Sequence, residues 1–195
     1  EGIDELADFA GADVSAITTA AMEGHLKFEE ALHQRLEIIK PSAAMFEAFE
    51  RERPAAFSPH VEALVAALHA KGVAVFLVSG GLRPMIEPLA KTLGVPLDNI
   101  FANVLHYDAA GNYASFDAKQ PTSYDGGKAE VMATLWDGKG LSPVVMVGDG
   151  ATDLQARPPA DMFVGYGGNV QREVVKAGCD WWVTDFSELV EATTE

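Results

Sequence analysis

The sequence predicts an α/β fold: a doubly wound parallel sheet with a small helical cap near the N-terminus and a β-hairpin insertion. Runs such as Val144–Val147 are apolar at every position, which is typical of strands covered on both faces in a parallel sheet between helices. Segments with helical periodicity alternate with these runs along the chain. A length of 195 residues is enough for one such domain with a sizeable buried core.

The first part of the chain is predicted to be helical throughout. Apolar residues such as Phe46 and Phe49 recur at helical spacing, and Pro41-Ser42 indicates that one helix ends there and another begins. We therefore predict a helical cap region over residues 1–53 and an α/β core over residues 54–195.

The core is predicted to begin with a helix followed by a strand. Ser58-Pro59 begins a helix that runs through His69, and Val73–Val78 follows it as an apolar strand. The other expected elements are a strand at Ile100–Asn103, a hairpin over residues 104–116 that turns at 108–112, a helix from Gly126 through about Trp136, and strands at Val144–Val147, Met162–Val164 and Trp181–Thr184.

The composition argues against several classes of function. A net charge of −15 repels the phosphate backbone of nucleic acids and anionic lipid. The apolar runs are far shorter than the roughly 20 residues that a membrane-spanning helix needs. The single cysteine, Cys179, cannot form an internal disulfide, and the first residues show no secretory or transit signal. We expect no nucleic-acid partner, no membrane span, and a reducing compartment, either the cytoplasm or an organelle stroma or matrix, rather than secretion.

A glycine-rich turn follows the predicted strand at Val73–Val78. Ser79, Gly80 and Gly81 precede a predicted helix, whose N-terminal N–H groups and partial positive charge attract anions. The pattern predicts a phosphate-binding turn, but ordinary strand-to-helix turns are also rich in glycine. A serine-hydrolase elbow fits less well, because Leu77 stands where its first glycine belongs.

Two carboxylates follow the predicted strand at Val144–Val147. Asp149 and Asp153 are four residues apart within Gly148–Asp153, so both can face the same way if the first ends the strand and the second lies in a first helical turn. Such a pair suits Mg²⁺, which takes oxygen ligands. One alternative is that Asp149 caps the helix. Another is a dinucleotide-binding loop, in which two carboxylates would repel the pyrophosphate.

Lys128 stands in the first turn of a predicted helix, where a cation opposes the helix dipole. A bound phosphate or a neighbouring carboxylate would compensate for this. The alternative is a solvated surface lysine. A further glycine-rich turn, Gly165–Asn169, follows another predicted strand and allows the loop to pass close to its neighbours.

Three features follow one another along the chain: the turn at Ser79–Gly81, called the serine turn below, then Lys128, then the aspartate pair. In this order they resemble the second, third and fourth motifs of the haloacid-dehalogenase-like (HAD) hydrolases. More narrowly, the chain resembles the phosphoserine phosphatase branch, particularly its eukaryotic members, over essentially its whole length. The segments that carry this resemblance are Glu1–Leu6, Phe76–Gly81, Gly126–Lys128, Gly148–Asp153 and Pro158–Asp161. The resemblance implies a Rossmann-like core of the HAD type.

The resemblance also implies an activity, namely Mg²⁺-dependent hydrolysis of O-phospho-L-serine to L-serine and phosphate through an aspartyl-phosphate, the last step of serine biosynthesis. It implies that Lys128 neutralises the phosphoryl group, that Asp149 binds the metal, and that Asp153 supports both. Ser79 and Gly80, with Gly81 beside them, would hold phosphate oxygens.

On the cap side, the resemblance implies that Glu1 and Arg35 read the amino and carboxylate groups of the substrate. Met22 and Phe28 would shape the wall of the site, and Thr152 would lie close to the substrate. Without the resemblance, Arg35 would be read as a surface residue of an amphipathic helix, and Met22 and Phe28 as packing within the cap.

The family's nucleophile and its acid/base partner belong to a D-x-D-x-T motif that precedes the residues matching Glu1–Ile3, and the sequence contains no D-x-D pair. We expect the natural polypeptide to be longer, or another chain or segment to supply this central strand, so a homodimer or a partner chain stays open.

Two functional alternatives also stay open: another small phosphomonoester as substrate, and a catalytically inactive HAD-fold protein that is a binding or structural subunit of a larger assembly.

Overall fold

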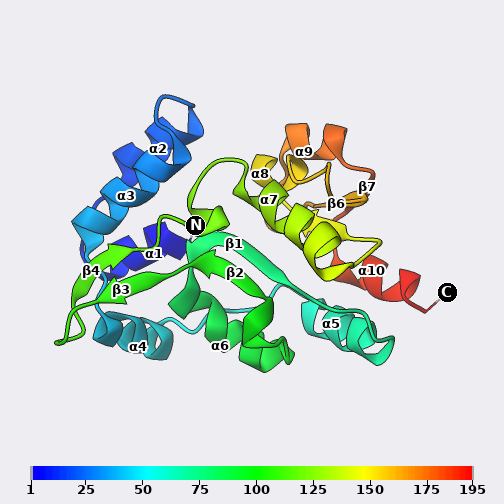
Figure 1. The fold of residues 1–195 in the computed structure, drawn as a ribbon, viewed down its shortest axis with the longest axis horizontal. Coiled ribbons are helices and arrows are strands. Elements are labelled where there is room, and N and C mark those ends of the chain that lie inside the picture. The colour runs from blue at the N-terminus through cyan, green and yellow to red at the C-terminus, as the bar shows by residue number, and fades with distance from the viewer. Residues whose placement is uncertain (1, 195) are drawn as a thin grey trace. The chain divides into compact units, whose positions relative to one another are not determined.

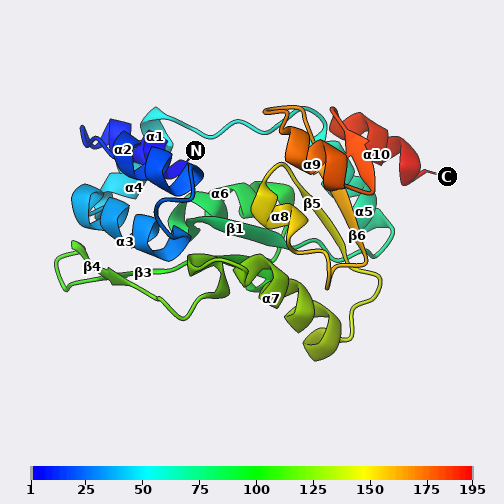
Figure 2. The same cartoon turned by 90° about the horizontal axis from the view of Figure 1, so that it is seen from above.

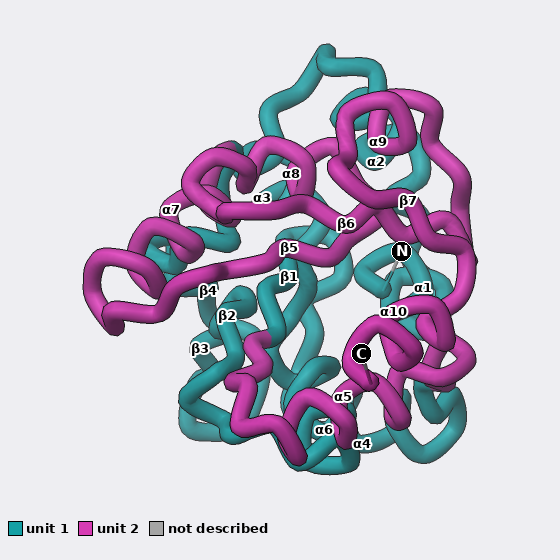
Figure 3. The backbone as a smooth tube through the Cα atoms, turned by 90° about the vertical axis from the view of Figure 1, so that its right-hand side faces the viewer, with its two compact units in different colours: residues 1–55, 77–125 teal, residues 56–76, 126–195 magenta. Residues whose placement is uncertain are grey.

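The computed structural model describes residues 2–194, which form two compact units. The first unit comprises residues 2–55 and 77–125. The second unit comprises residues 56–76 and 126–194 (Figure 3). Each unit is described by itself below. The division into residues 1–53 and 54–195 stays a prediction.

The first unit begins with the predicted helices. They are α1 (Gly2–Phe9), α2 (Ser15–Met22), α3 (Phe28–Ile39) and α4 (Ala43–Glu52). Ser42 caps α4, because its side chain accepts a hydrogen bond from the Met45 N–H at 3.2 Å. The helix break predicted at Pro41-Ser42 is therefore confirmed.

A β-hairpin packs against these helices. Strands β3 (Leu105–Tyr107) and β4 (Tyr113–Phe116) are antiparallel, as predicted for residues 104–116. The hairpin lies beside α3 in both views (Figures 1 and 2), where the His33 and Phe116 rings are 6.1 Å apart. The buried apolar residues of this core are Ile3, Leu6, Ala7, Val14, Leu32, Leu36, Ile39, Phe46, Phe49, Leu82 and Leu105.

The first unit also holds a parallel pair of strands, β1 (Leu77–Leu82) and β2 (Ile100–Asn103). Helix α6 (Arg83–Leu93) follows β1 and packs against both strands (Figure 1), and short 3₁₀ turns lie at Leu97–Asn99 and Pro121–Ser123. The prediction of β2 is confirmed.

The strand predicted at Val73–Val78 is displaced along the chain. The observed β1 begins at Leu77 and continues through the serine turn to Leu82. The partner strand β2 is only four residues long, and its first residue, Ile100, pairs with Leu77, which is where β1 begins. The apolar run therefore did not determine the strand boundaries.

The second unit contains a three-stranded parallel sheet in the order β5-β6-β7, which confirms the predicted parallel α/β architecture. The strands are β5 (Val145–Gly148), β6 (Met162–Tyr166) and β7 (Trp181–Val183). The helices are α5 (Val61–Ala70), α7 (Gly127–Ala133), α8 (Ala151–Leu154), α9 (Glu173–Gly178) and α10 (Phe186–Ala192), with a π-helical turn at Thr134–Gly138. Its apolar core includes Leu64, Val164, Tyr166, Val183 and Leu189.

Strand β5 is less covered than its apolar sequence predicted. Val145 and Val147 are 47% and 36% exposed, whereas Met146 between them is buried. Side chains alternate between the two faces of a strand, so the described residues cover only the face that carries Met146. The prediction that this strand is buried on both faces is wrong. Separately, no helix within residues 2–194 has the length and apolar character needed to cross a bilayer.

Candidate active site

Lys128 and Asp153 form an ion pair in the second unit. The Lys128 Nζ lies 2.5 Å from Asp153 Oδ1, and the two side chains are 18% and 7% exposed. The other oxygen of Asp153 accepts a hydrogen bond from the Gly150 N–H at 2.9 Å. The anion that Lys128 needs in the first turn of α7 is therefore supplied by a carboxylate, and that carboxylate also holds the loop after β5.

Asp149 pairs with a residue that the sequence analysis did not identify. The Arg172 Nη1 donates to Asp149 Oδ2 at 2.5 Å and to the Asp149 carbonyl oxygen at 2.9 Å. The N-cap of α8 is Gly150 and not Asp149, so the helix-capping alternative for Asp149 is wrong. Thr152 lies in α8, half-buried, between the loop and Asp153.

The donor set around Asp149 fits a metal only in part. Among the described residues, no three His, Cys, Asp or Glu side chains gather as a metal-binding group. Mg²⁺ needs only one or two carboxylates, because it keeps several waters. Asp149, with a side chain 37% exposed at the end of β5, fits as one such ligand.

The serine turn lies in the first unit, within β1. The Ser79 Oγ accepts a hydrogen bond from the Gly81 N–H at 3.0 Å. Phe28 of α3 packs on the same turn, since a Cβ added to Gly80 would lie 2.9 Å from the Phe28 Cζ. The fold thus brings Phe28 to the predicted phosphate-binding turn, and the absence of a side chain at Gly80 makes room for the ring.

Arg35 is 8% exposed on the inward face of α3, so its interpretation as a surface residue is wrong. Its Nε donates to the Ala31 carbonyl oxygen at 3.3 Å. Burial lowers the pKa of the Arg35 guanidinium, and the charge of Asp4 partly opposes this. Met22 is 76% exposed at the end of α2, which argues against packing within the cap.

The predicted site residues are divided between the two units. Met22, Phe28, Arg35, Ser79, Gly80 and Gly81 lie in the first unit, and Lys128, Asp149, Thr152 and Asp153 lie in the second. Glu1 lies outside the described residues. The roles assigned to these residues stay predictions.

Asn103 and Thr122 were also missed by the sequence analysis. They are 0% and 3% exposed, and they hydrogen-bond to each other beneath the serine turn. The only sequence signal was a lone amide in the apolar stretch Ile100–Leu105.

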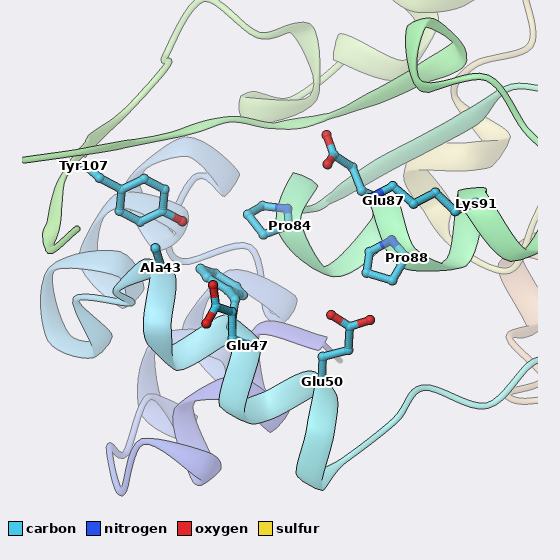
Figure 4. Close-up of a pocket in the computed structure, with 9 residues that line it drawn as sticks. Ala43, Glu47, Glu50, Pro84, Glu87, Pro88, Lys91 and Tyr107 are labelled. Atoms are coloured by element: carbon cyan, nitrogen blue, oxygen red, sulfur yellow. The ribbon is translucent and has the colours of Figure 1, made fainter.

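A separate pocket of about 390 Å³ opens in the first unit (Figure 4). Its lining comes from α4, α6 and β3, and comprises Ala43, Phe46, Glu47, Glu50, Pro84, Glu87, Pro88, Lys91 and Tyr107. Burial raises the pKa of the Tyr107 hydroxyl. None of the predicted site residues is in this lining.

Comparison with known proteins places this geometry in a family. The model of the haloacid dehalogenase-like hydrolases matches residues 3–156. The chain belongs to the haloacid dehalogenase-like hydrolases. The predicted HAD-type fold and the expectation of a hydrolase are thereby confirmed.

Within the HAD-like hydrolases, the similar proteins confirm the resemblance to phosphoserine phosphatases. The Bos taurus protein of that name is 46% identical over 197 residues, which cover 100% of this chain and 88% of the bovine one. The chloroplastic phosphoserine phosphatase of Arabidopsis thaliana is 45% identical, covering 98% of this chain and 66% of that one. A solved structure described as a phospho-aspartyl intermediate analogue of phosphoserine phosphatase has a TM-score of 0.79 at 26% identity, covering 98% and 91% of the two chains.

Proposed function

We propose that this HAD-like hydrolase is a phosphoric monoester hydrolase that converts O-phospho-L-serine to L-serine and phosphate with the help of Mg²⁺. The observation that carries the proposal is the shielded Lys128–Asp153 ion pair beside the loop of Asp149, in a chain 46% identical to a phosphoserine phosphatase. Phosphoryl transfer requires stabilisation of the negative charge on the phosphoryl oxygens. An ammonium fixed in position, together with a carboxylate that can bind Mg²⁺, would supply it.

Each residue then has a proposed role. The Lys128 ammonium neutralises phosphoryl charge, and Asp153 keeps that ammonium in place, as its contact with Nζ supports. Asp149 is proposed to bind Mg²⁺, which when bound supplies positive charge to the phosphoryl oxygens. Ser79 and the backbone of Gly80 and Gly81 hold phosphate oxygens.

The nucleophile is proposed to be an aspartate of a D-x-D-x-T segment outside residues 1–195, because the sequence contains no D-x-D pair. A carboxylate nucleophile divides hydrolysis into two easier steps, and a second carboxylate serves as acid and then base. The related structure described as a phospho-aspartyl intermediate analogue supports this order of events.

The substrate assignment rests on the cap side. Arg35 is proposed to bind the carboxylate of phosphoserine, and its burial supports a fixed orientation for the guanidinium. Glu1 is proposed to bind the ammonium, Met22 and Phe28 to form the wall, and Thr152 to lie close to the substrate. Phe28 is supported by its position against Gly80.

The test is phosphate release by the full-length natural polypeptide from O-phospho-L-serine in the presence of Mg²⁺. We expect Lys128→Ala and Asp149→Asn to lower kcat by roughly 100-fold or more, because each removes charge stabilisation of the transition state. Lys119→Ala removes an exposed lysine and is the matched control, with activity unchanged.

Phosphothreonine and glycerol phosphate are the competing substrates in this assay. Turnover of either, with none of phosphoserine, would contradict the substrate assignment. Release of phosphate from none of them would contradict the enzymatic function and favour an inactive subunit.

The setting of the reaction is also a proposal. We propose that it takes place in the cytoplasm or in an organelle stroma or matrix and supplies serine for biosynthesis. The lone Cys179 and the chloroplastic name of the Arabidopsis relative support a reducing compartment of this kind.

A further inference from the structure

We propose that Asn103 and Thr122 are positioning residues that fix the backbone of the phosphate-binding turn at Ser79–Gly81. The inference rests on the proposed function, because it assigns a task to two residues that do not themselves touch substrate. It concerns only contacts within the first unit.

Two hydrogen bonds in series connect these residues to the turn, and this pair of bonds is called the relay below. The Asn103 Nδ2 donates to the Gly80 carbonyl oxygen at 2.8 Å, and the Asn103 Oδ1 accepts from the Thr122 Oγ1 at 3.1 Å. Asn103 is 0% exposed and Thr122 is 3% exposed. Water therefore does not compete for these bonds, and each partner would be left unsatisfied if the other were removed.

The strand pairing explains why the turn needs a side chain to hold it. Val78 pairs with Phe101, and the next paired residue of β1 is Leu82, opposite Asn103. The regular ladder is therefore interrupted at Ser79–Gly81. Such bulges redirect backbone groups and side chains, and they are frequent beside active sites. The Asn103 amide satisfies the Gly80 carbonyl oxygen at the point where the neighbouring strand does not.

This arrangement leaves one face of the turn available for an anion. The Ser79 Oγ is already an acceptor for the Gly81 N–H, so its own O–H remains as a donor within the described structure. With the Gly80 carbonyl oxygen held by Asn103, that oxygen is kept from repelling a phosphate oxygen. The relay thereby fixes which backbone atoms face the ligand.

Thr122 locks the orientation of the Asn103 amide. The side-chain oxygen and nitrogen of asparagine can exchange places by rotation, and only one orientation places the NH₂ group toward Gly80. The Thr122 hydroxyl donates to the oxygen, which selects that orientation. Thr122 lies in the 3₁₀ turn Pro121–Ser123, in the segment that leads along the chain to Gly126.

A substitution series at Thr122 separates positioning from general stability. Thr122→Val keeps the shape but removes the hydroxyl, and Thr122→Ser keeps the hydroxyl. Ile100→Val is the matched control, because it deletes a buried methylene group in β2 without touching the relay. The measurements, on full-length protein with Mg²⁺, are the Kd for inorganic phosphate by calorimetry, kcat with phosphoserine, and Tm.

We expect Thr122→Val to weaken phosphate binding and to lower kcat by roughly tenfold each, since small displacements of binding groups cost this much or more. Thr122→Ser should stay within about threefold of the wild type by the same reasoning. Ile100→Val should lower Tm and leave phosphate binding unchanged. Should Thr122→Val not fold, Thr122→Ala, which also lacks the hydroxyl, replaces it.

The outcomes distinguish this inference from the proposed function. No turnover by the wild type contradicts the proposed function. Wild-type turnover with equal phosphate affinity in Thr122→Val and Thr122→Ser overturns the relay. Weakened phosphate binding in Ile100→Val as well would also overturn it, because the effect would then follow stability and not the hydrogen bond.

Discussion

Asp153 holds the Lys128 ammonium at 2.5 Å, and both side chains are largely shielded from solvent. Removing one partner of such a pair leaves an uncompensated charge in a site with little water, whereas removing both leaves none. The energetic signature of the pair is therefore non-additivity, which a double-mutant cycle measures.

We expect Lys128→Met and Asp153→Asn each to lower the free energy of unfolding by about 2–4 kcal/mol, slightly less than the roughly 3–5 kcal/mol for breaking a fully buried ion pair, because the Lys128 side chain is 18% exposed. Asn keeps an acceptor for the Gly150 N–H, so its effect reports mainly the charge. The double variant should lose at least about 1 kcal/mol less than the sum of the singles. Chemical denaturation measures all three, and additive losses would show that the pair does not couple.

Gly148 is expected to be intolerant of any side chain. A Cβ at this position would lie 2.3 Å from the Asp153 Cγ, so Gly148→Ala must displace the carboxylate that holds Lys128. We expect a loss of about 1–3 kcal/mol of unfolding free energy, as for overpacked cores.

Gly138→Ala is the control for this substitution, because its added Cβ would meet only Thr134 Cγ2 at an ordinary 3.7 Å. Its Tm should be unchanged or slightly raised, since alanine favours helices. Equal Tm values for the two alanine variants would contradict the close approach to Asp153.

The partner of Lys128 illustrates what the sequence could predict. A lysine in a first helical turn opposes the dipole, so a nearby anion was one of two interpretations of Lys128, the other being a solvated surface lysine. The parallel architecture followed similarly from apolar runs such as that at β6, which is buried at nearly every position. Both predictions rest on local chemistry.

Other features depend on contacts between distant segments. The limits of β1 depend on its partner β2, so the apolar run placed the strand too early. Arg172 is 23 residues from Asp149, and Asn103 is 23 residues from Gly80. Nothing in the local sequence of either residue indicates its partner, because only the fold brings them together.

Magnesium binding should depend on Asp149 and respond to Arg172. We expect Asp149→Asn to raise the Kd for Mg²⁺ at least roughly tenfold, because the proposed carboxylate ligand is lost. Arg172→Gln should lower that Kd a few-fold, because the guanidinium competes with the metal for the Asp149 carboxylate.

Calorimetry with MgCl₂ on the full-length protein measures both changes. Arg157→Gln is the control, because this arginine pairs with Asp180 and not with Asp149. Weaker Mg²⁺ binding in Arg172→Gln would show that Arg172 orients the ligand rather than competing with the metal.

Asp185 is expected to make the stability of the second unit depend on pH. It caps α10 by accepting a hydrogen bond from the Ser187 N–H at 2.7 Å, and the hydrogen bonds from Ser187 lower the pKa of this carboxyl. A carboxyl with a lowered folded-state pKa stabilises the fold above its unfolded value, about 3.9 for aspartate, and this contribution is lost as the pH falls through the folded value.

Asp185→Ala should therefore lower Tm at pH 7, and the difference from the wild type should shrink as the pH is taken below about 3.9. Thermal melts by circular dichroism across this range measure it. Asp185→Asn keeps an acceptor for the cap and is the control, with a smaller loss at pH 7. A constant difference at every pH would show that the charge of Asp185 plays no part.

The contact between Phe28 and Gly80 joins the proposed wall of the substrate site to the proposed phosphate-binding turn. A larger residue at position 80 would collide with the ring, and a different ring at position 28 would change what rests on the turn. Substitutions at Phe28 that are meant to change the proposed substrate wall would thus disturb the proposed phosphate-binding turn as well. These two positions have to be redesigned together, and accepted changes at one should be accompanied by compensating changes at the other.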